Sequence, residues 1–224
     1  MNNYYTVEKE KLKELIVLVQ NDKFDNQFTS TAYYRYLVAC NSDVNLAFSA
    51  MKDHVEWRKL KDVENISLDS CQSTVSRNIL IFAPLDRNGH SVICCIIRRH
   101  DKNDRDLKEL ENFIIFNMEK AVKMSNPDEE KIIIIMDLHG FGLKNMDYDL
   151  VKLLIDIVQA QYRECLFKIF IVNYPWIFIA CWAIIKPWID IKTVSKVEFT
   201  DFDNLNKYMD ISALPEDILR GSLD

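Results

Sequence analysis

KIFIVNYPWIFIACWAIIKPWID, residues 168–190, joins two apolar segments at a proline. The residues just before Asn173 are β-branched or aromatic and predict a strand, whereas Pro175 suits the first turn of a helix that Pro187 ends. The apolar run Ile169–Ile185 is shorter than the ~20 residues that a membrane-spanning helix needs, and the proline divides it. The stretch therefore predicts a buried strand followed at once by an apolar helix, as in α/β proteins.

The surrounding segments repeat this alternation. Periodicity and Ile- and Val-rich runs predict helices over 107–124 and 148–162, and strands at 132–136, 167–172 and 194–200. Two further apolar runs, 78–82 and 92–97, flank Asp86-Arg87-Asn88-Gly89, a turn sequence in which Gly89 supplies a positive φ. Continuous apolar strands separated by helices indicate an α/β fold with a mixed, largely parallel sheet that helices flank on both faces.

The first part of the chain shows only helical spacing of apolar residues. These residues are Leu12, Leu15, Ile16 and Val19, then Val44, Ala47, Phe48, Met51 and Val55. We therefore expect a helical N-terminal subdomain over residues 1–65 and the α/β domain over 66–224. The charged residues at 8–13 are typical of an amphipathic helix rather than of a signal peptide.

Charge and cysteine usage limit the possible function classes. The formal net charge of -6 leaves no broad basic surface for nucleic acid. One basic run is nearly cancelled by interspersed acids and is predicted to be a solvated loop and helix start. Its cations are Arg98, Arg99, Lys102, Arg105 and Lys108, and its acids are Asp101, Asp104, Asp106 and Glu109. The six cysteines form no CxxC pair and lie mostly in apolar runs, so we expect a cytoplasmic protein.

The sequence shows no recognisable motif for catalysis or for binding a cofactor or a metal. Gly140-Phe141-Gly142 follows a strand, but a dinucleotide-binding loop needs a third glycine where Asn145 stands. The four histidines are scattered, without an HExxH motif or paired metal ligands. Asp137 ends a strand, where catalytic carboxylates occur, but no acid or base partner is visible beside it. We expect no enzyme activity, no cofactor and no metal.

The helix predicted after Pro175 is apolar on every face. Up to Lys186, its only polar side-chain groups are the indole N–H groups of Trp176 and Trp182. Such a helix is either sealed in a protein core or faces an apolar partner that is not protein. Periodicity leaves both interpretations open.

Several separate motifs occur in the order and spacing of a known family. They are Ile132–Phe141, Lys168–Trp176, Lys186–Asp190 and Leu214–Asp217, preceded by Asp43-Val44 and Glu56–Lys59. Together they resemble the signature of the CRAL-TRIO family over roughly Tyr33 to Gly221. The linkage between the motifs makes the resemblance far more specific than any single motif.

The resemblance implies an α/β bowl that encloses one lipid in an apolar cavity. The helix matching Trp176–Ile185 is then a mobile gate over that cavity. Its implied ligand-facing residues are Trp176, Phe178, Ile179, Trp182 and Ile185. Members of the family bind phosphatidylinositol, phosphatidylcholine, sterols, squalene, tocopherol or retinoids, so the family leaves the ligand open.

The resemblance also implies a headgroup site. Fungal phosphatidylinositol-transfer members contact the inositol phosphate through a glutamate before a strand and a lysine after the gate helix. The matching positions are Glu164 and Lys196, with Thr193 nearby. Lys196 suits a phosphate, whereas Glu164 and Thr193 suit inositol hydroxyls. The alternative is that Glu164 and Lys196 form an ordinary surface ion pair.

The hydroxyl groups with which these relatives hold phosphocholine are absent here. The matching positions are Phe82, Ile93, Ile132 and Val158, which are expected to line the apolar cavity. Phosphatidylcholine recognition of that kind is therefore not expected. The relatives also carry a basic residue where Cys40 stands, which leaves Arg163 or Arg220 to supply the missing charge.

The sequence therefore predicts a non-catalytic lipid carrier that is cytoplasmic and transiently peripheral to membranes. The expected ligand is phosphatidylinositol or a phosphoinositide, exchanged through the gate helix. One alternative is a lipid-regulated scaffold or protein-interaction module. Another is a carrier of a different hydrophobic ligand, such as a sterol, tocopherol or retinoid.

Overall fold

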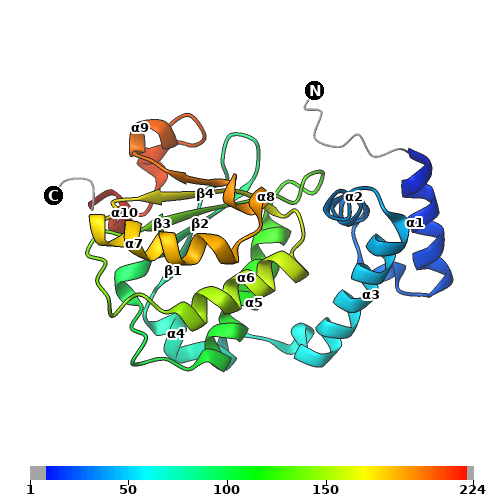
Figure 1. The fold of residues 1–224 in the computed structure, drawn as a ribbon, viewed down its shortest axis with the longest axis horizontal. Helices are drawn as coiled ribbons and strands as arrows, with labels where there is room; N and C mark the ends of the chain where they lie inside the picture. The colour runs from blue at the N-terminus through cyan, green and yellow to red at the C-terminus, as the bar shows by residue number, and fades with distance from the viewer. Residues whose placement is uncertain (1–8, 221–224) are drawn as a thin grey trace.

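A computed structural model describes residues 9–220 of the chain (Figure 1). The helices are α1 (Lys9–Asn21), α2 (Ser30–Ala39), α3 (Val44–Lys61), α4 (Gln72–Ser76), α5 (Leu107–Met124), α6 (Tyr148–Gln161), α7 (Trp176–Ile185), α8 (Ile191–Val194), α9 (Phe202–Leu205) and α10 (Glu216–Arg220). The strands are β1 (Leu80–Ala83), β2 (Ser91–Ile96), β3 (Ile132–Asp137), β4 (Leu166–Val172) and β5 (Val197–Phe199). The ends of the two predicted subdomains, residues 1–8 and 221–224, lie outside the described part.

The five strands form one sheet in the order β1-β2-β3-β4-β5. β1 pairs with β2 in antiparallel fashion, and the other pairs are parallel. The turn between β1 and β2 has Gly89 at φ 86°, with its N–H donating to the Asp86 carbonyl at 3.1 Å. The predicted mixed, largely parallel sheet is therefore confirmed, together with its first strand pair.

The crossover helices all lie on one face of this sheet. Each parallel connection steps in the same direction across the sheet, and crossovers of this kind are almost always right-handed. The helices that they carry must then cover the same face. Figure 1 shows α5, α6 and α7 below the sheet and α9 above it.

Alternate strand residues build two apolar layers, one on each face of the sheet. Ile133 and Ile135 pack with the C-terminal segment, which contributes Leu205, Met209, Leu214 and Ile218. Their neighbours Ile132 and Ile134 face the crossover helices instead. Cys94 and Cys95 are divided between the two layers in the same way. Burial on both faces confirms the interpretation of the Ile- and Val-rich runs.

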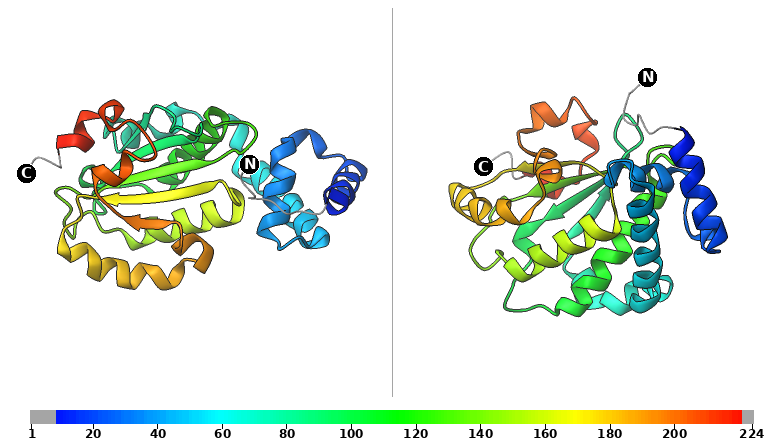
Figure 2. Two further views of the ribbon diagram at one scale, coloured as in Figure 1. Left: turned by 90° about the horizontal axis from the view of Figure 1, so that it is seen from above. Right: turned by 45° about the vertical axis from the view of Figure 1, so that its right-hand side comes forward.

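Helices α1, α2 and α3 pack around an apolar cluster of their own, with Leu15, Tyr36, Leu37 and Met51 at its centre. Figure 1 and the left view of Figure 2 show this group beside the sheet rather than over either face. Helix α2 was not predicted, because its tyrosines and threonine have modest helix propensity. Thr29 caps it by accepting a hydrogen bond from the Ala32 N–H at 3.1 Å.

The strand predicted at 194–200 is shorter than expected. The side chain of Asp190 accepts a hydrogen bond from the Thr193 N–H at 2.9 Å and caps a helical turn, α8, which includes Val194. The prediction was therefore wrong over 194–196, and only Val197–Phe199 pairs with β4.

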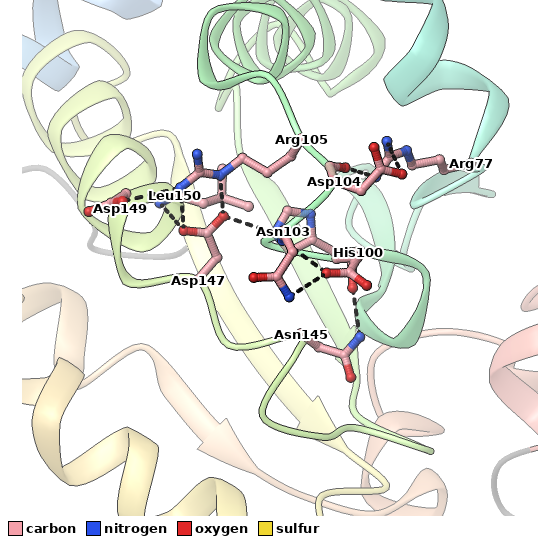
Figure 3. Close-up of polar contacts among 10 residues, drawn as sticks. Arg77, His100, Asn103, Asp104, Arg105, Asn145, Asp147, Asp149 and Leu150 are labelled. Carbon is pink, nitrogen blue, oxygen red and sulfur yellow. Dashed lines mark hydrogen bonds and ion pairs between the residues drawn. The ribbon is translucent and has the colours of Figure 1, made fainter.

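The basic run forms a loop that is exposed at residues 102–104 and the start of α5, as predicted, but its arginines are not neutralised by their sequence neighbours alone. Figure 3 shows Arg105 bound instead to two carboxylates at the start of α6, Asp147 at 2.8 Å and Asp149 at 3.1 Å. His100 binds Asp147 as well, at 3.0 Å. Burial alone would raise the pKa of Asp147, but the hydrogen bonds from Arg105, the Leu150 N–H and His100 lower it to about 2. Loops at the carboxyl ends of neighbouring parallel strands meet, which brings these distant charges together.

Candidate functional site

Helix α7 begins and ends at prolines, as predicted. Pro175 is its N-cap residue, and the Pro175 carbonyl accepts a hydrogen bond from the Phe178 N–H at 2.9 Å. A short 3-10 turn, Lys186–Trp188, follows α7 and contains Pro187. Because proline has no N–H to donate, the α-helical pattern stops there. Within residues 9–220, no helix is long and apolar enough to cross a membrane.

The turn that leads into α7 is held by a buried carboxylate. Asp137 is fully buried at the end of β3 and accepts hydrogen bonds from Arg98 at 2.5 Å and from the Asn173 side chain at 2.8 Å. Asn173 itself adopts a left-handed backbone with φ 53°. Arg98 also contacts Asp217 in α10 at 3.3 Å. Asp137 thus has a structural partner that its sequence surroundings did not reveal.

The two sides of α7 have different surroundings. Phe178 is 4% exposed and packs edge-on against Phe141, with ring centroids 5.4 Å apart. Cys181 and Ile185 are buried on the same side. The opposite side is open, with Trp176 82% exposed and Ile179 48% exposed. The core interpretation therefore holds for one side of this apolar helix, and an apolar partner for the exposed side stays a prediction.

The predicted gate and cavity residues fall into two clusters on one face of the sheet, except Trp176 and Ile179, which are exposed and belong to neither. Phe82, Ile93, Ile132 and Val158 lie in a cluster with α5 and α6. Phe178, Trp182 and Ile185 of α7 lie in a second cluster with β4 and β5. Ile134 belongs to the first cluster and Met136, two residues along β3, to the second. The clusters are thus adjoining parts of a single apolar layer.

The three predicted headgroup residues line one pocket. Glu164, Thr193 and Lys196 border a cavity of about 240 Å³ beside the amino ends of β4 and β5. Lys196 Nζ lies 3.1 Å from Glu164 Oε2, and both side chains are mostly buried. The ion pair considered from the sequence is therefore present, and it forms part of the pocket wall.

The pocket wall carries further polar groups that the resemblance did not assign. They are Gln159 and Arg163 from the end of α6 and the turn after it, and Asp190 and Lys192 around α8. Burial alone would raise the pKa of Asp190, but hydrogen bonds from Thr193 and Lys192 lower it. Arg163 was noted in the sequence only as a possible substitute charge, and Gln159 gave no signal. The side chain of Arg220 lies outside the described part.

A model of the CRAL/TRIO domain matches residues 76–218, which is more than half of the chain and includes all five strands. The chain belongs to the CRAL/TRIO domain family. One relative within this family is a phosphatidylinositol transfer protein, CSR1, from Eremothecium gossypii, 32% identical over 178 residues and 74% of this chain. Another is a phosphatidylinositol/phosphatidylcholine transfer protein, SFH4, from Arabidopsis thaliana, 26% identical over 81% of this chain.

The present CRAL/TRIO chain spans 41% of the length of the Eremothecium protein and 34% of the Arabidopsis protein. Among solved structures, Sfh5 shares its fold, with a TM-score of 0.73. That match covers 89% of this chain and 82% of Sfh5 at 19% sequence identity. The comparison supports the fold, including the helices that precede the sheet.

The helical group α1–α3 meets the rest of this CRAL/TRIO fold through buried ion pairs. Arg35 of α2 binds Glu130 at 2.7 Å, and Arg58 of α3 binds Glu119 of α5 at 2.8 Å. These four residues border a second cavity, of about 750 Å³, between the helical group and the sheet domain. Its lining holds four cations (Arg35, Arg58, Lys59 and Lys123) and four acids (Asp62, Glu64, Glu119 and Glu130), and the ion pairs among them in the described part of the chain are those of Arg35 with Glu130 and of Arg58 with Glu64 and Glu119.

Arg35 also fixes the turn that carries one of the predicted headgroup residues, Glu164. Its Nη1 donates to the Arg163 carbonyl at 2.8 Å and to the Cys165 sulfur at 2.9 Å. Between these two residues, Glu164 adopts a left-handed backbone with φ 55°. Because a non-glycine residue rarely holds this conformation without support, the contact with α2 stabilises the geometry of the pocket wall.

Proposed function

We propose that this chain is a non-catalytic carrier that binds one phosphatidylinositol or phosphoinositide molecule and exchanges it at membranes. The observation that carries the proposal is the convergence of Glu164, Thr193 and Lys196 on one pocket. Lys196 donates one hydrogen bond to Glu164, and a lysine ammonium has further N–H groups to offer a phosphate. Glu164 and Thr193 supply oxygen atoms for the hydroxyls of an inositol ring.

The size of the pocket suits a headgroup and not a whole lipid. A cavity of about 240 Å³ has room for about eight waters at ~30 Å³ each. Such a space accepts a substituted sugar-like ring but not two acyl chains. Val158 borders the pocket and also packs in the apolar layer under the sheet. We place the acyl chains along that layer, between the sheet and helices α5, α6 and α7.

Helix α7 is the proposed gate for exchange. A two-chain phospholipid exposes about 30 methylenes, and at ~0.8 kcal/mol each their transfer into water costs more than 20 kcal/mol. Exchange through water is therefore slow, whereas a helix that rests on a bilayer lets the chains pass between apolar surroundings. The exposed side of α7, with Trp176, Ile179 and Ile184, is suited to that contact. Membrane binding of this kind is transient and suits a cytoplasmic carrier.

Phosphatidylinositol is favoured over phosphatidylcholine for two reasons. The positions matching the choline site, Phe82, Ile93, Ile132 and Val158, have no hydroxyl groups and lie in an apolar cluster. The Eremothecium relative is a phosphatidylinositol transfer protein by name. The Arabidopsis relative is named for both lipids, so the distinction rests on the side chains.

Native mass spectrometry of the purified chain, followed by identification of the extracted lipid, tests this function. We expect one bound lipid per chain, mainly phosphatidylinositol or a phosphorylated form. Recovery of mainly phosphatidylcholine, sterol or retinoid would contradict the headgroup assignment. A chain that retains no lipid and transfers none between vesicles would support the scaffold alternative instead.

Replacement of Lys196 by alanine is expected to weaken phosphatidylinositol binding by about 1.5 to 3 kcal/mol, the usual contribution of a hydrogen bond to a charged group. Titration with vesicles containing labelled phosphatidylinositol measures this change. Lys168→Ala is a matched control, because Lys168 pairs with Glu198 at 3.0 Å with similar exposure but away from the pocket. If wild type and Lys196→Ala bind phosphatidylinositol with equal affinity, Lys196 has only a structural role.

A further inference from the structure

A buried histidine in front of β2 lies between two carboxylates. His90 is 2% exposed, with its Nδ1 2.9 Å from Asp86 Oδ2 and its Nε2 3.0 Å from Glu129 Oε2. A neutral imidazole has one N–H and one lone pair, so it can donate to only one of these carboxylates. An imidazolium donates to both. The geometry therefore fits the charged form of His90.

Asp86 needs this charge more than Glu129 does. The Asp86 side chain is fully buried, whereas that of Glu129 is 42% exposed. Burial alone would raise the pKa of Asp86, but hydrogen bonds from the His90 side chain and from the His90 and Asn88 N–H groups lower it. In the described part of the chain, no lysine or arginine pairs with Asp86. A buried carboxylate without a cation is strongly unfavourable, so His90 supplies its counter-charge.

The surroundings of His90 make its charge sensitive to pH. Phe167 of β4 packs on the ring, with ring centroids 4.3 Å apart, and Lys131 interacts electrostatically with Glu129. Burial alone would lower the pKa of His90, but the hydrogen bonds to Asp86 and Glu129 raise it. Its contribution to stability is therefore complete below the unfolded pKa of ~6.5 and is lost as the pH rises through the raised pKa of the folded state.

Glu129 belongs to a loop that also holds the helical group. This loop connects α5 to β3. Its Glu130 binds Arg35 of α2 at 2.7 Å, and its Pro127 carbonyl accepts a hydrogen bond from the Thr31 hydroxyl of α2 at 2.6 Å. The imidazolium therefore holds, from the side of the β1–β2 turn, the same loop to which α2 is bound.

We propose that His90 forms a pH-sensitive link between the sheet and the helical group α1–α3. In its doubly protonated form it fixes the α5–β3 loop, and through that loop it fixes α2. When the ring loses one proton to water, one carboxylate faces a lone pair instead of an N–H group. The half-exposed Glu129 can then turn to solvent, which releases the loop on that side. This link does not depend on which lipid the chain carries.

Nuclear magnetic resonance of the whole chain with isotope-labelled histidine tests the protonation state directly. At about pH 6, both ring nitrogens of His90 should carry protons, and one should lose its proton as the pH rises. Contacts with the Phe167 ring identify the His90 signals. Glu129→Gln, which removes the more exposed carboxylate, should make His90 lose its proton at a lower pH than in wild type. A His90 ring that is neutral at about pH 6 would overturn the proposal.

Urea-induced unfolding of wild type and His90→Gln tests the effect on stability. At about pH 5.5, the unfolding equilibrium constant of the variant should exceed that of wild type by about tenfold or more, the usual effect of losing a hydrogen bond to a charged group. The difference should shrink toward about pH 9. His54→Gln is the control, because His54 is also buried but burial lowers its pKa to about 4. This variant should keep the loss of stability that wild type shows above about pH 7.

Hydrogen exchange of the α2 amides tests the connection to the helical group. After correction for intrinsic rates, these amides should exchange faster at about pH 9 than at about pH 5.5 in wild type, and His90→Gln should show little of this dependence. A stability difference between wild type and His90→Gln that is the same at every pH would show that the ring is only structural, and would overturn the proposal. Exchange in α2 with the same pH dependence in both proteins would overturn the link to the helical group.

Discussion

Replacing Arg35 by alanine is expected to lower the free energy of unfolding by about 3 to 5 kcal/mol, because it leaves a buried carboxylate without its partner. The Arg35 and Glu130 side chains are only 8% and 4% exposed, and they meet at 2.7 Å. Burial alone would lower the pKa of Arg35, but Cys165 and Glu130 raise it, so the guanidinium stays charged. The same substitution removes the hydrogen bond to the Arg163 carbonyl and releases the pocket turn.

Urea-induced unfolding measures this loss in the free energy of unfolding. Two further variants show how much of it comes from the unpaired carboxylate. Lys52→Ala removes an exposed pair with Asp22 and should leave the stability close to that of wild type. The double variant Arg35→Met with Glu130→Leu removes both charges at once and should recover most of the lost stability. A loss for Arg35→Ala no larger than that for Lys52→Ala would show that the Glu130 carboxylate does not depend on Arg35.

Two substitutions one residue apart on α7 are expected to have opposite consequences. Phe178→Ala should cost about 3 to 5 kcal/mol of stability, because its ring fills a buried site against Phe141. Ile179→Asp should change stability by only about 0.5 kcal/mol, because Ile179 is 48% exposed. The introduced carboxylate should nevertheless reduce lipid transfer by about tenfold, since a charge on the membrane-facing side opposes docking.

Denaturant unfolding and vesicle transfer, run in parallel, separate these effects. Leu46→Asp is a suitable control, because Leu46 is 60% exposed on α3, away from the proposed gate. It should neither unfold the protein nor slow transfer. Normal transfer by a folded Ile179→Asp protein would show that this side of α7 does not meet the bilayer. Unfolding of that variant would show that the helix is structural throughout.

The elements predicted most accurately are those whose sequence shows both a regular spacing of apolar residues and a capping residue or proline at an end. Helix α5 begins after Asp106, which caps it, and α7 lies between two prolines. The strands were recognisable because burial on both faces requires continuous apolar runs. The convergence of Glu164 and Lys196 was also predictable, but only through the resemblance to a family and not through periodicity.

What the sequence did not reveal depends on contacts between distant residues. Arg35 lies in a tyrosine-rich helix, and its partner Glu130 is 95 positions away, so no local pattern predicts a buried charge there. The acids that neutralise Arg105 belong to the start of α6, more than 40 residues later. Gln159 resembles any polar residue at the end of an amphipathic helix. Only the structure shows that Gln159 borders the same pocket as Lys192 and Thr193 of α8.

The strand order has a consequence for synthesis of the chain on the ribosome. Each strand lies beside the one made just before it, so no strand has to be inserted between two that have already paired. The sheet can therefore grow at one edge as the chain emerges, and each crossover helix covers the same face as it forms. The opposite face, including Ile133 and Phe170, is covered in the described part of the chain by residues 202–219, which follow all five strands. A nascent chain that has just released β5 thus exposes one bare apolar face, and chaperone binding is most valuable at that stage.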